Sequence, residues 1–169
     1  MPPPPLVAIV GWVVPGAGYW LIGQRLRGLV IGVTILLLFV GGLLIGGIRV
    51  IDSPFIEAAD ERAQRLQDDA LARKENPNYE PPSVVVRLLH QKPWFIPQVV
   101  AGPVALGANY VAVNWGKHID PATMREAQGV APSHARVNEI GVLYTAVAGM
   151  LNLMAIIDAA YRASNEGAR

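Results

Sequence analysis

Three polar side chains lie inside long apolar stretches of the sequence, where a polar group could act as a functional site: Asn109, Asn152 and Asp158. An ionisable group at membrane depth is a functional candidate, because its burial is costly. Asp158 comes within one helical turn of Tyr161 and Arg162, which favours a carboxylate at the headgroup level, paired with a basic residue. For Asn152 we expect an interhelical hydrogen bond, with Asn109 as its partner.

Other residue types that could carry chemistry are missing or scattered. The sequence has no cysteine, which excludes disulfides, thiol nucleophiles and cysteine-based metal sites. It has no glycine-rich phosphate loop and no nucleophile elbow. Its three histidines are too far apart to form a helix-spaced metal pair: His90, His118 and His134. We therefore predict no catalytic, cofactor-binding or metal site, and no enzyme. The net charge of +1 gives no general attraction to nucleic acid.

The elements that must position the polar residues are apolar helices. Hydrophobic residues make up 52% of the 169 residues and charged residues 16%, and residues 6–22 and 28–48 contain no charge at all. A helix needs about 20 apolar residues to cross a hydrocarbon core of roughly 30 Å. We therefore predict an all-α polytopic membrane protein in a lipid bilayer, with about four transmembrane helices, at residues 6–22, 28–50, 94–115 and 139–161.

The first two of these helices should form a tight hairpin that turns between Gly23 and Gly28. Pro15 should bend the first helix, because a proline frees a carbonyl of the preceding turn. The arginines at the turn favour a cytoplasmic turn, and four crossings would then place both termini outside. The seven basic residues of segment 49–93 argue for the opposite orientation. The hairpin is defined by Pro15, Gly16, Gly18, Gly23, Arg25 and Arg27.

Small residues recur four positions apart in these helices. Such spacing lets two helix backbones approach closely, so we predict helix-packing faces. A plain abundance of glycine in membrane helices is the alternative interpretation. The residues concerned are Gly28, Gly32, Gly42, Gly46, Gly141, Thr145 and Gly149.

The segment between the second and third apolar helices is polar and divides the chain into three parts: 1–50, 51–93 and 94–169. We predict an extramembrane helix that starts at Ser53-Pro54 and ends before Asn76-Pro77, followed by a stiff proline-rich connector. A thin apolar stripe follows this helix, at Ile56, Ala59, Ala63, Leu66 and Ala70. It either contacts a partner or belongs to a solvated face.

Residues 15–28 carry a recognisable pattern, formed by Pro15, Gly16, Gly18, Tyr19, Trp20, Gly23, Gln24, Arg25, Arg27 and Gly28. This pattern resembles a widespread family of small membrane proteins built on a two-transmembrane-helix hairpin domain. Residues 141–159 are similar to the last helix of an uncharacterised bacterial family of four-helix membrane proteins that places such a hairpin first. The resemblance implies membrane topology and brings no catalytic residue with it.

Two functions are compatible with these features. The first is a structural or interaction role, as a scaffold or accessory subunit of the bacterial inner membrane, with a protein partner or a second copy of the chain. A sequence rich in packing residues and poor in reactive ones favours it. The alternative is a small transporter or channel component, in which broken helices expose carbonyls to a cavity lined by Asn109, Asn152 and Asp158.

Overall fold

The structure, a computed structural model, describes residues 2–51, 59–90, 93–115, 117–119, 126–128 and 135–167. The predicted helix start at Ser53-Pro54 and His134 lie outside this range. The described elements are α1 (Pro4–Val13), α2 (Ala17–Leu21), α3 (Arg25–Gly46), the 3-10 helix η1 (Ile48–Val50), α4 (Ala59–Glu75), α5 (Val84–His90), α6 (Phe95–Val100), α7 (Pro103–Asn114), β1 (Lys117–Ile119), β2 (Glu126–Gln128) and α8 (Ala135–Gly167). The fold is all-α, as predicted, apart from the short antiparallel pair β1–β2.

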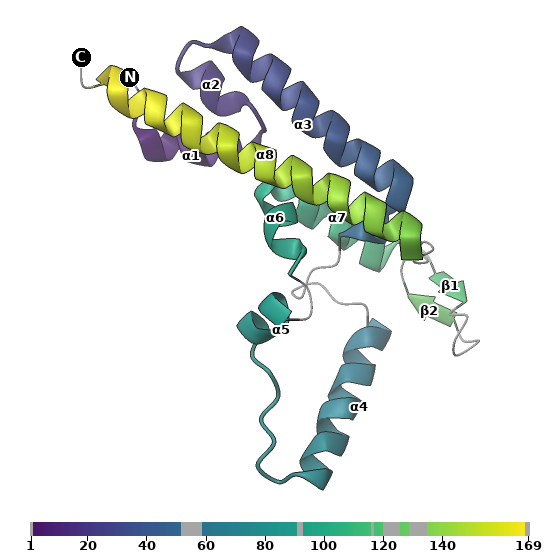
Figure 1. Cartoon of the computed structure of the whole chain (residues 1–169). Coiled ribbons are helices and arrows are strands. Elements are labelled where there is room, and N and C mark those ends of the chain that lie inside the picture. Colours follow the sequence, from purple (N-terminus) through teal and green to yellow (C-terminus); the bar gives the residue numbers. More distant parts are fainter. Residues whose placement is uncertain are drawn as a thin grey trace.

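Two described helices are long and apolar enough to cross a membrane: α3, and residues 136–165 within α8. They lie side by side and run in opposite directions (Figure 1). Neither contains a proline, so each continues without a break. The helix predicted over 28–50 ends earlier, at Gly46, because Gly47 takes a positive φ of 80°.

The prediction of one bent helix over residues 6–22 is wrong. α1 ends at Val13, and Val14 is extended, because the residue before a proline is pushed out of the helical region by Pro15. α2 begins after Gly16, whose φ of 84° is left-handed. The chain therefore forms two short helices here. The turn that follows falls between Leu21 and Arg25, so both arginines belong to the first turn of α3.

The chain reverses direction at this break. A Cβ added to Gly18 of α2 would lie 3.0 Å from the carbonyl oxygen of Val7 in α1 and 3.3 Å from Cβ of Ala159, near the end of α8. Gly11, one turn further along α1, lies against Ile156 of α8. α1 thus runs from the end of α8 toward its middle, and α2 returns toward the end where α1 began.

The prediction of one helix over residues 94–115 is wrong in the same way. α6 and α7 are separated at Gly102, whose φ is 111°, and a proline opens α7. α6 follows α8 inward: Gln98 contacts Thr145, and the carbonyl of Val100 reaches Asn152. α7 packs against η1, which follows the end of α3, so the chain turns back here too.

The body, formed by α1–α3 and α6–α8, therefore repeats one plan. In each half a broken helix pair enters and leaves at one end, and a long helix then runs to the other end. Both termini and the turn before α3 lie at the same end of the body (Figure 1). The predicted topology placed the turn on one side and the termini on the other; in the structure they share one end, because residues 6–22 double back.

The arm, formed by α4, α5 and the connector between them, hangs away from α3 and α8 (Figure 1). α4 ends at Glu75, before Asn76-Pro77, as predicted. The connector folds back on α4, where the Tyr79 hydroxyl donates a hydrogen bond of 3.0 Å to Asp69. That bond raises the pKa of Tyr79 above its usual value near 10, so its contribution to stability is present at neutral pH and is lost as the pH rises past the raised pKa.

The core of the body lies where α1, α3, α6 and α8 meet. Large apolar side chains come from the first three helices, whereas α8 supplies mainly alanines. Small residues on α8 let the neighbouring backbones come close, which is the packing typical of membrane helices. The buried apolar residues include Val7, Ile35, Phe39, Phe95, Ala148, Ala155 and Ala159.

Candidate functional site

The two helix breaks meet beside Asn152 of α8. The side-chain amide of Asn152 donates hydrogen bonds to the carbonyl oxygens of Val100, at 2.9 Å, and Gly11, at 3.3 Å. The indole N–H of Trp12 in α1 donates to the carbonyl of Val99 in α6, at 3.1 Å. Asn152 is fully buried, and its Oδ1 has no hydrogen-bond partner among the described residues. The predicted partner, Asn109, is also buried, in α7.

A second buried polar contact fixes the start of the second broken pair. The amide of Gln98 in α6 donates to Oγ1 of Thr145, at 2.8 Å, and to the carbonyl of Val50, at 3.2 Å. Oγ1 of Thr145 donates in turn to a carbonyl of its own helix. α6, η1 and α8 are thereby joined at one point. Sequence reasoning missed Gln98, although an uncharged amide inside an apolar stretch was the available signal.

Two of the predicted small-residue faces, Gly42 and Gly46 of α3 and Gly141 and Thr145 of α8, lie against each other in the structure. A Cβ added to Gly42 would lie 2.8 Å from Cγ2 of Thr145. A Cβ added to Gly141 would lie 2.6 Å from Cα of Gly46. At these positions the two helix backbones touch, and a larger side chain would have to push them apart.

The other small residues of the prediction contact the helix breaks rather than a second long helix. Gly28 and Gly32 of α3 lie against Gly16 and the carbonyl of Pro15 in the first break. Gly149 of α8 faces the carbonyl of Pro97 in α6, which would overlap an added Cβ. The glycines of the long helices therefore make room for the backbone of the broken pairs.

Asp158 is the centre of a polar cluster at the end of the body that holds both termini. Its Oδ2 accepts hydrogen bonds from the hydroxyl of Tyr19, at 2.6 Å, and from Nε of Arg162, at 2.8 Å. The guanidinium of Arg27 lies 3.9 Å away and also stacks over the Tyr19 ring, 5.5 Å from its centroid. The carboxylate thus joins α2, α3 and α8, and Arg162 and Arg27 are the basic residues near it.

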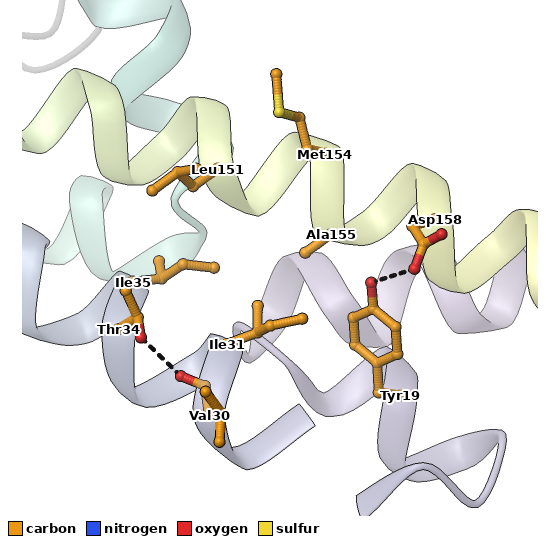
Figure 2. A pocket seen from close by; sticks show the side chains of 9 residues that line it. All are labelled: Tyr19, Val30, Ile31, Thr34, Ile35, Leu151, Met154, Ala155 and Asp158. Atoms are coloured by element: carbon orange, nitrogen blue, oxygen red, sulfur yellow. Dashed lines mark hydrogen bonds between the residues drawn. The ribbon is translucent and has the colours of Figure 1, made fainter. Parts of the chain in front are cut away.

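A cavity of about 320 Å³ opens beside this cluster, between α3 and α8. Tyr19 and Asp158 close one end of it, and the hydroxyl of Thr34 in its wall is already bonded to the carbonyl of Val30 (Figure 2). Most of the wall is apolar. The lining residues are Tyr19, Val30, Ile31, Thr34, Ile35, Leu151, Met154, Ala155 and Asp158.

This arrangement offers hydrogen bonds and an apolar recess. Within the described residues, no group of three or more His, Cys, Asp or Glu side chains could hold a metal ion. The polar residues that the prediction named do not share one site: Asn152 lies at the helix breaks, whereas Asp158 lies at the end of the body. Sequence reasoning also missed the contacts of Tyr19 and Trp12, because it assigned both aromatic residues to a single helix.

Comparison with known proteins gives the family and no function. No curated protein and no solved structure matches the chain. A family model described as a family of unknown function, DUF6677, matches residues 6–168, a range that includes residues 15–28 and 141–159. The more specific resemblance of residues 15–28 to two-helix hairpin domains stays a prediction. Because the match extends over nearly the whole sequence, the chain belongs to DUF6677, a family of unknown function.

Proposed function

We propose that this protein is embedded in the bacterial inner membrane and acts as a structural or interaction component of a larger membrane assembly. Two helices long and apolar enough to cross a membrane support the location. Both carry large apolar side chains that are well exposed, among them Leu26 (77%), Leu44 (81%) and Met154 (64%). In water such surfaces would favour aggregation, whereas in a bilayer they face lipid chains.

The body as a whole lies within the bilayer in this proposal. α3 and α8 cross it, and the two broken pairs enter it from opposite sides. Non-helical backbone at membrane depth is tolerated only where it is buried in protein, and Gly16 and the carbonyl of Val100 meet that requirement. The four crossings that the sequence predicts would be replaced by two crossings and two re-entrant pairs.

Cysteine accessibility tests this topology, because the chain has no native cysteine. With the N-terminus as reference, a cysteine at Gly23 should react with a membrane-impermeant thiol reagent from the same side as Pro2→Cys. A cysteine at Asn76 in the arm should react from the opposite side. Labelling of Gly23→Cys from the side opposite to Pro2→Cys would restore the four-crossing topology and contradict the re-entrant pairs.

The arm carries the interaction role. The described part of its predicted apolar stripe, Ala63, Leu66 and Ala70, is exposed on a helix that stands apart from α3 and α8. A stripe at helical spacing that is not buried in its own chain suits the groove of a partner helix or a second copy. This exposed stripe is the observation that carries the proposal.

Site-specific photo-crosslinking tests the arm in native membranes. A benzophenone side chain at Leu66 should give one discrete adduct with a partner protein or a second copy. The same group at Gln64, which is exposed on nearly the opposite face of α4, is the matched control and should give none. A monomer in mild detergent, without adducts from either position, would count against an interaction role.

A small transporter or channel component is the second candidate, and the meeting of two helix breaks at Asn152 favours it. In transporters, broken helices at an interface between inverted repeats form the binding site near the bilayer midplane. Proteoliposomes loaded with a potassium- or pH-sensitive dye would report ion flux. This candidate expects flux above that of empty liposomes and its loss in Asn152→Leu. Flux that survives both Asn152→Leu and Asp158→Asn would remove these residues from any pathway.

A further inference from the structure

We infer that the cavity between α3 and α8 is a lipid site: it holds one acyl chain of an acidic phospholipid, whose phosphate lies against Arg27. The proposal concerns a ligand of the body, and it is independent of the partner proposed for the arm. It rests on the membrane location and on three features of the cavity: its apolar wall, its charged end and the depth of that end.

The wall of the cavity suits a hydrocarbon chain. Its volume of about 320 Å³ lies at the lower end of the usual range for ligand sites, ~300 to 1,000 Å³. Ile31 and Leu151 contribute apolar surface from the two facing helices, and the hydroxyl of Thr34 already donates its proton to the carbonyl of Val30 in its own helix (Figure 2). The cavity is open, and its lining residues Val30 and Met154 are exposed on α3 and α8, so in this proposal a chain from the surrounding bilayer can enter without leaving lipid.

The end of the cavity suits an anion. Asp158 at this end of the cavity lies beside two guanidinium groups, those of Arg162 at 2.8 Å and Arg27 at 3.9 Å. The side chain of Arg27 is 47% exposed. A guanidinium has five N–H donors and binds phosphate oxygens in pairs, so Arg27 has donors to offer beyond those that face Asp158.

The depth of the charged end matches that of a headgroup. Trp20, at the end of α2, and Tyr161, one turn after Asp158, are both exposed. Exposed Trp and Tyr are typical of the membrane–water interface. A phospholipid whose phosphate lies at this level would direct its chain toward the middle of the bilayer, along the line from Asp158 to Leu151.

A second copy of the protein is a poorer occupant. Copies related by a two-fold axis along the membrane normal carry the same residues at the same depth. Docking at this cavity would therefore bring the exposed Arg27 side chains of both copies to one level, and their like charges would oppose the contact. The phosphate of a single anionic lipid would instead be attracted to Arg27.

Native mass spectrometry of the detergent-solubilised protein tests the headgroup. The full chain is mixed with equal amounts of phosphatidylglycerol and phosphatidylcholine that have identical acyl chains. We expect retention of the anionic lipid to exceed that of the zwitterionic lipid about tenfold. Arg27→Gln should lower this ratio toward one. Arg49→Gln, which removes the same charge in η1, just beyond the other end of α3, should leave it unchanged.

A second pair of variants tests the chain. Thr34→Phe fills the cavity and should abolish retention of both lipids. Val33→Phe places the same side chain on the neighbouring exposed position, which does not line the cavity, and should retain them. Met154→Trp, from the facing helix, repeats the test if Thr34→Phe does not fold.

Three results would overturn the proposal. The first is equal retention of the two lipids by the unaltered protein. The second is undiminished retention in folded Thr34→Phe, which would place the lipid elsewhere. The third is a change from dimer to monomer in Thr34→Phe without a change in bound lipid, which would identify a second copy as the occupant. Each can be distinguished from failure of the partner proposal, because none involves the arm.

Discussion

Two kinds of contact, close backbone packing and side-chain hydrogen bonds, occur in each broken helix pair, but their balance differs at the two breaks. In the first pair, backbone packs against backbone: Pro15 and Gly16 lie against Gly28 and Gly32 of α3. In the second pair, polar side chains make the connections: Gln98 bonds to Thr145 and to the carbonyl of Val50, and Asn152 bonds to the carbonyl of Val100.

This difference shows two ways to accommodate a helix break in a bilayer. A break frees carbonyls and N–H groups that find no water in the hydrocarbon region and must be covered by protein. Glycine covers them by letting another helix come close, a solution that tolerates no added side chain. A side-chain amide satisfies the freed carbonyls by donating hydrogen bonds to them. Such a contact tolerates small changes in side-chain volume better, but it is lost when the N–H donor is removed. The two breaks should therefore respond to different substitutions.

The largest expected effect is at the first break. Gly16→Ala should lower the free energy of unfolding by about 3 kcal/mol, because a Cβ would overlap the carbonyl of Gly28 and because the left-handed backbone disfavours any side chain. Unfolding can be followed by circular dichroism in mixed micelles of a mild detergent and dodecyl sulfate.

The neighbouring turn provides the matched control. Gly23 has a nearly equal φ of 82°, but a Cβ there would meet no described atom within 4 Å. Gly23→Ala should therefore cost about 1 kcal/mol, the part that is due to the backbone alone. Equal losses in the two variants would show that close packing contributes nothing to the first break.

A smaller effect is expected where the second break also depends on a glycine. Gly149→Ala should cost about 2 kcal/mol, since the added methyl group would overlap the carbonyl of Pro97 and force α6 away from α8. Gly107→Ala, at an open position of α7, is the control and should not destabilise the protein. A loss as large as that of Gly16→Ala would break the contrast between the two pairs.

The sequence was sufficient to predict the helical fold and a bend near Pro15, but not that the helices over 6–22 and 94–115 are interrupted and double back. Pro15 and Pro103 mark both breaks, and the glycines spaced by four mark surfaces where backbones touch. A proline allows either a bent helix that continues or a pair that doubles back, and local residue patterns do not distinguish them. The choice depends on contacts more than 80 positions apart, such as Trp12 with Val99.

For the polar residues, the contacts within one helix could be predicted from the sequence, whereas those between distant segments could not. The pairing of the Asp158 carboxylate with a basic residue was predicted correctly, because Arg162 lies only one helical turn further along the same helix. Its contact with Tyr19 is 139 positions distant and became visible only when the first pair doubled back. Asn152 was expected to bond to a side chain. It bonds instead to the backbone carbonyls of Gly11 and Val100, which can accept its hydrogen bonds because the two helices are interrupted nearby.

The next prediction tests the polar contacts of the second break. Asn152→Leu keeps the size of the side chain but leaves the carbonyls of Val100 and Gly11 without this donor. We expect a loss of about 1.5 kcal/mol, near the upper end for hydrogen bonds between membrane helices. The control is Asn114→Leu at the exposed end of α7, where the amide bonds to the carbonyl of Tyr110 in its own helix. A comparable loss in both variants would show that the position of Asn152 between the breaks has no special importance.

The smallest expected effect concerns the hydrogen bond that the indole of Trp12, in the first broken pair, donates to the carbonyl of Val99, in the second. Trp12→Phe keeps an aromatic ring but removes the donor, and we expect a loss of about 0.6 kcal/mol, the average for a hydrogen bond between membrane helices. Trp115→Phe, at an exposed position after α7, should change nothing. The double variant Trp12→Phe/Asn152→Leu tests whether the two breaks are stabilised independently. If they are, its loss of unfolding free energy should equal the sum of the two single losses. A difference of more than about 0.5 kcal/mol from that sum would show that the two breaks are energetically coupled.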